Sequence, residues 1–201
     1  MAVDTTIALI TLAEAKSFLK ITTTSEDSIV GDLINECSVW INTYCGRKLI
    51  YPAVPYTEYY DGNGTSQLFL KNWPIITVTS LYMDYLRAWT ADTAIDLTAD
   101  VQTDLESGIL TLWNNQSLYG QGVGNVRVIY TAGYTHNSNV PYDLKLACKK
   151  LAAWKYFQDY SQRRYGVASE STGERQVNYS DEPLLPDVKQ ILNRYRRLGA
   201  Q

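Results

Sequence analysis

The sequence has very little histidine and cysteine, the residues on which many catalytic and metal sites depend. Its 201 residues include one histidine, His136, in a polar turn at 135–139, and three cysteines, Cys37, Cys45 and Cys148. One histidine cannot form a His-rich zinc site or a histidine acid/base pair. The cysteines lie on apolar faces of helical patterns, so we expect buried free thiols of a reducing compartment. We expect His136 on the surface.

Motifs for cofactors and membranes are missing as well. The glycine-rich stretch at 120–124 lacks the Lys-Ser/Thr pair of a phosphate loop, and no H-x-x-H, C-x-x-C or EF-hand spacing occurs. No apolar run approaches the roughly 18 residues of a membrane span. The first residues lack the basic segment of a signal peptide and include Asp4, so we expect synthesis in a cytoplasm. The sequence therefore predicts no cofactor, no bound metal and no membrane partner, and it carries no recognisable catalytic motif.

The net charge of −3 is distributed unevenly along the chain. Residues 1–140 hold 7 Lys and Arg against 14 Asp and Glu, a net of −7, whereas residues 141–201 hold 11 against 7, a net of +4. A reader of duplex DNA would be basic overall, so this balance argues against sequence-specific DNA binding. It permits head-to-tail docking between copies or docking on an acidic partner, with ordinary solvated charge as the alternative.

Hydrophobic periodicity predicts helices towards both ends of the chain and strands in the middle. Apolar side chains recur every three or four residues in the predicted helices, which are 11–20, 25–45, 141–160 and a final helix within 184–201. The middle segment, 49–135, alternates in short runs, with strands at 57–60, 67–70, 76–82, 109–113 and 126–131. The predicted fold class is α+β: a helical core of three to four helices with an inserted antiparallel β-hairpin and sheet region.

Local signals mark several of these boundaries. Thr11 and Glu14 have the spacing of a capping box at the start of the first helix, and Gly46 suits the end of the second. The turn Asp61-Gly62-Asn63-Gly64 predicts a hairpin between the first two strands.

Two polar segments interrupt the pattern. Residues 84–107 hold six acids and one base, Arg87, and are predicted to form an exposed excursion. Most of their acids recur at every fourth residue, which fits one helix face that could bind a hard cation weakly, although a solvated face or loop is the stronger interpretation. Residues 161–183 are polar and irregular, so we expect a flexible tether that orders when copies assemble.

Aromatic residues are abundant, with 16 Tyr and 5 Trp. Such residues could form a sugar- or base-stacking surface, but tyrosine-rich, charge-poor surfaces are more typical of protein interfaces. Trp40 and Trp154 lie on the apolar faces of predicted helices, where we expect them to pack in the core.

Three segments together resemble one protein family in their order and spacing. The first is LITLAEAKSFLKI at 9–21, followed by a helix that ends in YCGRKL at 44–49. The second is YTEYYDG at 56–62, followed by LFL at 68–70, and the third is VRVIYTAGY at 126–134, followed by VPYDLK at 140–145. With the residues SESTG at 169–173, the chain resembles the head–tail connector proteins of tailed bacteriophages, the neck adaptor family.

The resemblance implies a non-enzymatic structural protein that forms a ring of about twelve copies beneath the portal of a filled head. Such a ring extends the DNA channel, lets double-stranded DNA pass without specific binding, and carries the stopper or tail-completion protein. The protein would lie in the virion neck after synthesis in the host bacterial cytoplasm. Two other functions stay open at this point: a virion module that binds carbohydrate or a host receptor, and a hydrolase with paired acids.

Three groups of residues are the predicted sites of this adaptor. The final helix is predicted to dock on the portal, with anchors and a basic rim formed by Leu185, Val188, Leu192, Tyr195, Arg194, Arg196 and Arg197. Packing of this helix on its own chain is the alternative. Contacts with the adjacent copy are assigned to Arg163, Arg164 and Arg175. The channel wall, or alternatively an outer solvated face, is assigned to Asp92, Asp96, Asp100, Asp104 and Glu106.

Overall fold

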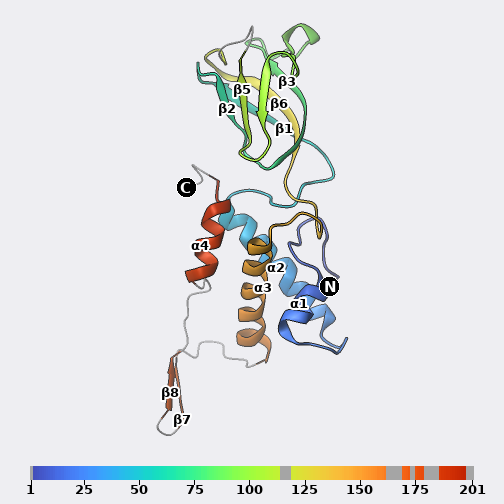
Figure 1. The fold of residues 1–201 in the computed structure, drawn as a ribbon, viewed down its shortest axis with the longest axis vertical. Helices are drawn as coiled ribbons and strands as arrows, with labels where there is room; N and C mark the ends of the chain where they lie inside the picture. The colour runs from blue at the N-terminus through green and yellow to red at the C-terminus, as the bar shows by residue number, and fades with distance from the viewer. Residues whose placement is uncertain (1, 114–118, 162–168, 173–174, 179–185, 198–201) are drawn as a thin grey trace. The chain divides into compact units, whose positions relative to one another are not determined.

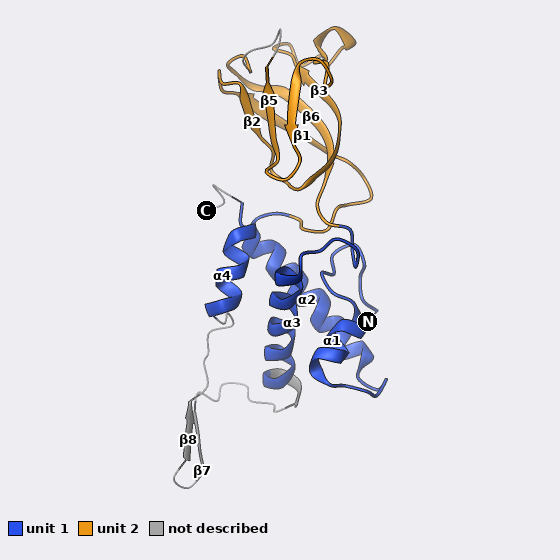
Figure 2. Cartoon of the chain, viewed as in Figure 1, with its two compact units in different colours: residues 1–47, 135–201 blue, residues 48–134 orange. Residues whose placement is uncertain are grey.

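The chain forms two compact units. The computed structural model describes residues 2–113, 119–161, 169–172, 175–178 and 186–197. Unit 1 comprises residues 1–47 and 135–201, and unit 2 comprises residues 48–134 (Figure 2). Unit 1 is helical and unit 2 is built from antiparallel strands, which confirms the predicted α+β class with an inserted β region.

Among its described residues, unit 1 contains four α-helices (Figure 1). They are α1 (Leu12–Leu19), α2 (Asp27–Cys45), α3 (Tyr142–Lys155) and α4 (Pro186–Tyr195). After Lys155 the third helix continues as a π-helix, η2, over Tyr156–Ser161. Between η2 and α4 the structure describes an antiparallel pair of short strands, β7 (Ser169–Thr172) and β8 (Arg175–Asn178), in a segment predicted to be irregular.

Capping residues fix the start of the first helix and the end of the second. The Thr11 hydroxyl accepts a hydrogen bond from the Glu14 backbone at 3.2 Å, and the Glu14 carboxylate accepts one from the Thr11 backbone at 2.9 Å. This is the predicted capping box, which satisfies two of the free N–H groups at the helix start. The second helix ends at Gly46, whose φ of 67° is favourable for glycine, as predicted.

The core of unit 1 forms where α2 and α3 pack together and both contact α4. Its fully buried side chains include Ile34, Ile41, Leu144, Leu151 and Leu192. The α2 and α3 members follow the three- and four-residue spacing read from the sequence, so the helical periodicity identified the buried faces of these helices.

In the part of unit 2 that the structure describes, the strands form two three-stranded antiparallel sheets that share one hydrophobic core. The first sheet has the order β1 (Tyr56–Gly62), β6 (Gly122–Ala132) and β3 (Ile75–Met83). The second has the order β2 (Gln67–Phe69), β5 (Ile109–Leu112) and β4 (Val101–Asp104). Alternate residues of both sheets, such as Val126, Val128 and Leu110, are buried between them.

The predicted hairpin between the first two strands is wrong. β1 pairs with β6 through Gly62, which lies opposite Gly122, and β2 pairs with β5 in the other sheet. The intervening turn is closed by the Asn63 side chain, which accepts from the Thr65 backbone at 3.0 Å, and it carries the chain from one sheet to the other. The Asp-Gly-Asn-Gly signal marks a turn correctly, but long-range pairing decides which strands meet.

The prediction of an exposed excursion at 84–107 is also wrong in part. This segment contains a 3₁₀ turn, η1 (Ala91–Thr93), and supplies β4, the edge strand of the second sheet. Ile95 and Val101 are buried in the core of unit 2. Two apolar residues in an acidic stretch were too weak a signal to reveal a strand.

Candidate interaction surfaces

The C-terminal helix, predicted to dock on the portal, packs against its own chain. Val188 and Leu192 are 1% and 0% exposed, and α4 contacts both α2 and α3. The structure therefore has the intramolecular arrangement that the sequence left as the alternative. Two of the four predicted anchors, Val188 and Leu192, are therefore buried in the core of unit 1. A third, Leu185, lies outside the described residues.

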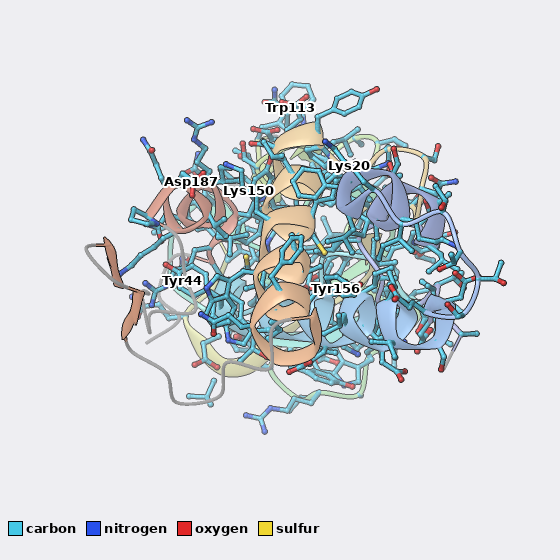
Figure 3. All side chains as sticks on the ribbon, turned by 90° about the horizontal axis from the view of Figure 1, so that it is seen from below. Lys20, Tyr44, Trp113, Lys150, Tyr156 and Asp187 are labelled. Atoms are coloured by element: carbon cyan, nitrogen blue, oxygen red, sulfur yellow. The ribbon has the colours of Figure 1, made fainter. Side chains whose placement is uncertain are left out.

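Polar contacts from α2 and α3 also hold α4. The Tyr44 hydroxyl donates to the Asn193 side chain at 2.7 Å, and Arg47 Nε donates to the Tyr195 carbonyl at 2.9 Å. Figure 3 shows Lys150 of α3 and Asp187 of α4 turned toward one another, where they form an ion pair. Apolar burial and polar contacts together make α4 a structural part of unit 1.

Tyr195 and the three arginines of the predicted rim differ in their surroundings. The Tyr195 hydroxyl donates to Asp143 at 2.5 Å, so this predicted anchor is half-buried at the α3–α4 contact. Arg194 and Arg196 are exposed, the first 4.0 Å from Asp143 and the second 6.0 Å from the Tyr44 ring. Arg197 is half-buried. The outer face of α4 and its C-terminal end thus present cationic groups while the apolar face is buried.

The arginines predicted to contact a neighbouring copy are only partly placed. Arg163 and Arg164 lie outside the described residues. The backbone of Arg175 lies in β8 opposite Thr172.

The five acids predicted to line a channel do not form one helix face. Asp92, Asp96, Asp104 and Glu106 are exposed and Asp100 is half-buried, and the five are spread over η1, two turns and β4. In the part of the chain that the structure describes, no group of three or more His, Cys, Asp or Glu is placed to hold a metal ion. The interpretation as a loop or solvated face is the better description.

Two of these acids stabilise the turns in which they lie. A hydrogen bond from the Thr98 hydroxyl, with backbone donors of Thr98 and Ala99, lowers the pKa of Asp96. Hydrogen bonds from the Ser107 hydroxyl and backbone likewise lower the pKa of Asp104. Aspartate accepts hydrogen bonds from the backbone two or three residues ahead, which explains why acids are frequent in these turns.

An exposed apolar stripe on α3 and η2 was missed by the sequence analysis. Tyr142 is 91% exposed, Leu146 is exposed one turn further along the same side of α3, and Phe157 of η2 is exposed as well. A shallow groove beside this helix is lined by Ala13, Glu14, Ser17, Phe18 and Lys149. Exposed apolar side chains in such an arrangement are typical of protein interaction surfaces.

Unit 2 has a second exposed apolar group, formed by the loop after β3 and the first residues of β6. Leu86, which is 90% exposed, and Tyr85 follow β3, and Val123 lies near the start of β6. The guanidinium of Arg87 donates to the Val123 carbonyl, which joins the loop after β3 to β6. The sequence did not reveal this surface, because its residues lie far apart along the chain and only the tertiary structure brings them together.

The thiols and the histidine serve packing and local structure. All three cysteines are free and buried, as predicted, and desolvation raises the pKa of Cys45 to about 11 and that of Cys148 to about 12. Such thiols are poor nucleophiles. His136 is half-buried rather than on the surface, and its Nδ1 lies 2.6 Å from the Ala8 carbonyl oxygen.

Among the described residues, no helix is both long and apolar enough to cross a membrane. A comparison with curated proteins gives no match.

Several solved structures share the fold over almost their whole length. A chain from the neck of an empty gene transfer agent (GTA) particle, computed with C6 symmetry, has a TM-score of 0.61 and is 20% identical, with 100% of this chain and 95% of that chain covered. A chain from the virion of a native GTA particle gives 0.59 and 18%, with the same coverage. A chain from the neck of a native GTA particle, computed with C12 symmetry, gives 0.53 and 16%, with 100% and 94% covered.

A family model gives the identification. The model of the head completion protein family matches residues 8–198, which span both units. This match confirms the predicted resemblance to head–tail connector proteins and the prediction of a structural adaptor, and it shows that the chain belongs to the head completion protein family.

Proposed function

We propose that copies of this structural adaptor form a ring beneath the portal of the DNA-filled head, extend the DNA channel and carry the stopper or tail. The observation that supports this most strongly is the family match over residues 8–198. The likeness to chains from GTA necks, which were computed with C6 and C12 symmetry, fits a multi-copy ring in the virion neck. In this proposal the protein has no catalytic activity, and its work is to make contacts.

The ring is also consistent with the exposed surfaces. A closed ring with one kind of contact requires two different patches on each subunit. The α3 stripe around Tyr142 and the loop surface around Leu86 lie on different units, so the chain offers more than one apolar patch to neighbours.

Portal docking in this proposal uses the outer face of α4, with the helix still packed on unit 1. The guanidinium groups of Arg194, Arg196 and Arg197 would meet the portal, where acidic side chains would complement them. Of the predicted anchors, Leu185 and the exposed part of Tyr195 would add contacts to the portal. Val188 and Leu192 would act indirectly by holding α4 in position, because both are buried. Many weak contacts around a ring would give strong attachment through avidity.

Two further assignments belong to the same proposal. Arg163, Arg164 and Arg175 would meet acids of the adjacent copy. Acids of the 92–106 segment would keep the channel wall free of cations, since each Lys or Arg on a phosphate adds salt-dependent affinity that would retard passing DNA.

The test is reconstitution on DNA-filled heads that lack this protein. Purified chain should bind at the portal vertex, and electron microscopy should show an added ring there. Replacing both Arg194 and Arg196 with Gln should weaken binding without loss of folding, whereas Lys189→Gln, at an exposed position nearer the start of α4, should not. Binding to heads without a portal, or to other parts of the virion, would contradict the proposal.

A further inference from the structure

Arg127 lies on the outer face of the first sheet of unit 2, between aromatic side chains. Its neighbours in the strand, Val126 and Val128, point into the core, so Arg127 projects from the opposite side of β6. Strand register places Tyr59 of β1 and Tyr82 of β3 directly beside it. The guanidinium carbon lies 4.3 Å from the centre of the Tyr82 ring.

A loop brings a further ring onto this arginine. The Trp89 ring centre lies 5.0 Å from the Arg127 guanidinium and 5.6 Å from the Tyr59 ring centre. The Asp84 carboxylate, which is buried, accepts hydrogen bonds of 2.8 Å from the backbone of Leu86 and of Trp89. These bonds hold the loop in a tight turn that places Trp89 beside the sheet.

The loop adopts an unfavourable backbone conformation to do so. Arg87 and Trp89 have φ values of 57° and 54°. A bulky residue in the left-handed region is uncommon, and such strain is retained where the surrounding structure imposes it, often at functional sites. Here it fixes one wall of the arrangement formed by Tyr59, Tyr82, Trp89 and Arg127, which we call the Arg127 clamp.

The clamp has a free donor. Arg127 Nε is buried and has no hydrogen-bond partner among the described residues. A buried donor without a partner is costly, and the N–H edge of a guanidinium matches the two oxygens of a carboxylate or phosphate. The residue type, the stacking and the unused donor together indicate a binding site for an anion.

The charge of unit 2 disfavours nucleic acid as that anion. Residues 48–134 hold 4 Lys and Arg against 8 Asp and Glu, a net of −4. A DNA-binding surface would need clustered cations. A single carboxylate on a protein segment needs only one arginine, and apolar residues beside it would contact the aromatic rings of the clamp.

A segment of this kind exists on the second sheet of the same unit. The turn between β4 and β5 carries Glu106, which is exposed and accepts no hydrogen bond from the described residues, and Leu105, which is also exposed. The first sheet carries the clamp and the second carries this turn. One copy therefore has a donor patch and a different acceptor patch, as a head-to-tail contact requires.

We propose that the Arg127 clamp of one copy binds the Glu106 carboxylate of the next copy, with Leu105 against the aromatic rings. This inference rests on the proposed ring, and it assigns a specific contact between neighbouring subunits. The loop after β3 is then a preformed part of a subunit interface.

Cross-linking in assembled necks tests the contact directly. Tyr59 is 51% exposed and borders Trp89, so a photo-reactive benzoylphenylalanine at position 59 should capture what the clamp binds. Rings assembled from mixed ¹⁵N-labelled and unlabelled chains distinguish links between copies from links within a chain. We expect a link between copies to residues 104–108. A link to DNA, to another protein or to another region would overturn the inference, even where a ring forms.

Charge exchange provides the second test. Arg127→Glu should weaken the affinity between neighbouring subunits by about tenfold or more. A tenfold change in affinity corresponds to ~1.4 kcal/mol per contact. Glu106→Arg should act similarly, and the two together should restore assembly. The matched control is Arg127→Glu with Asp92→Arg, which replaces another exposed acid that lies outside the turn and should not restore assembly.

The outcomes separate the two proposals. Normal assembly of Arg127→Glu, or no rescue by Glu106→Arg when the variants have normal urea midpoints as monomers, would overturn the clamp contact but leave the ring intact. Failure of the unmodified chain to form a ring on filled heads would instead overturn the proposed function, and the clamp contact with it.

Discussion

The acids of the two units do different work. In unit 1, carboxylates join helices through ion pairs: Glu14 of α1 lies 3.0 Å from Lys145 of α3, and Glu36 of α2 pairs with Lys155 of α3. In unit 2, Asp96 and Asp104 accept hydrogen bonds from the turns in which they lie. Among the described residues, the ion pairs that Lys16, Lys145, Lys150, Lys155 and Arg194 form with acids all lie in unit 1.

This difference explains why counting acids and bases along the sequence says little about what each charged side chain does in the fold. A carboxylate that bonds to its own turn holds the loop in place whatever lies nearby, whereas a carboxylate in an ion pair depends on a distant element. The first kind of contact is local and weakly affected by salt, and the second is screened by salt. The two units should therefore respond differently to mutation and solvent.

The largest expected effect is in the core of unit 1. Leu192→Ala removes a fully buried side chain of α4 and should lower the free energy of unfolding by about 2–5 kcal/mol. Urea unfolding followed by circular dichroism measures this. The control is Gln190→Ala on the exposed face of α4, with an expected change within about 0.5 kcal/mol. Equal behaviour of the two variants would mean that α4 detaches freely.

The next effect concerns a buried polar network in unit 2. The Tyr130 hydroxyl accepts from the Asn72 backbone at 3.2 Å and donates to the Glu58 carboxylate at 2.8 Å. Tyr130→Phe should cost about 1–3 kcal/mol because both partners lose a bond in a partly dry site. Tyr51→Phe, at an exposed position of the same unit, serves as the control in urea unfolding. A cost no greater than that of the control would exclude a structural role for the network.

A smaller and pH-dependent effect is expected at Asp84. Burial raises the pKa of this carboxyl, but backbone hydrogen bonds from Trp89, Leu86, Ala88 and Arg87 outweigh burial and lower it overall. A lowered folded-state pKa means that the ionised group stabilises the fold above its ordinary pKa of about 3.9 and that this stability is lost as pH falls below it.

Asp84→Asn should therefore lower the urea midpoint at pH 7 and flatten its fall below about pH 4. The midpoint of Asp92→Asn, an exposed acid of the same segment, should match that of the unmodified chain at both pH values. Loss of near-ultraviolet signal from Trp89 in Asp84→Asn would show that the loop depends on this carboxylate. An unchanged pH profile would contradict the assignment.

The smallest effect is expected at an exposed ion pair. Lys155→Gln breaks the pair with Glu36 and should cost about 0.2–1 kcal/mol at low salt. In roughly 1 M salt this difference should largely disappear because the charges are screened. The turn acids of unit 2 should show no such salt dependence, and a salt-dependent effect of Asp84→Asn would remove the distinction between the units.

The sequence predicted those features of the fold that depend on neighbouring residues, such as the ends of helices. Thr11, Glu14 and Gly46 identified helix ends because capping depends on neighbouring backbone groups. The pairing of β1 with β6 was not predictable, since Tyr56 and Tyr130 lie 74 residues apart yet form one register pair. Nothing in the local sequence at 61–64 distinguishes a hairpin turn from a crossing between sheets.

The candidate sites likewise have features that the local sequence predicts and features that depend on distant residues. Sequence alone indicated an amphipathic C-terminal helix, because the apolar spacing of Val188 and Leu192 is a local property. It could not decide what covers that face, and the structure places it on α2 and α3.

The sequence by itself determined the helical and strand periodicities, the helix caps and a family resemblance carried by short motifs in a fixed order. Tertiary structure alone decided that α4 is part of unit 1, that acids at 96 and 104 stabilise turns, and that Trp89 stacks on Arg127. The physical reason is distance along the chain. Capping and periodicity act within a few residues, whereas burial, strand pairing and ring stacking depend on which distant segments meet.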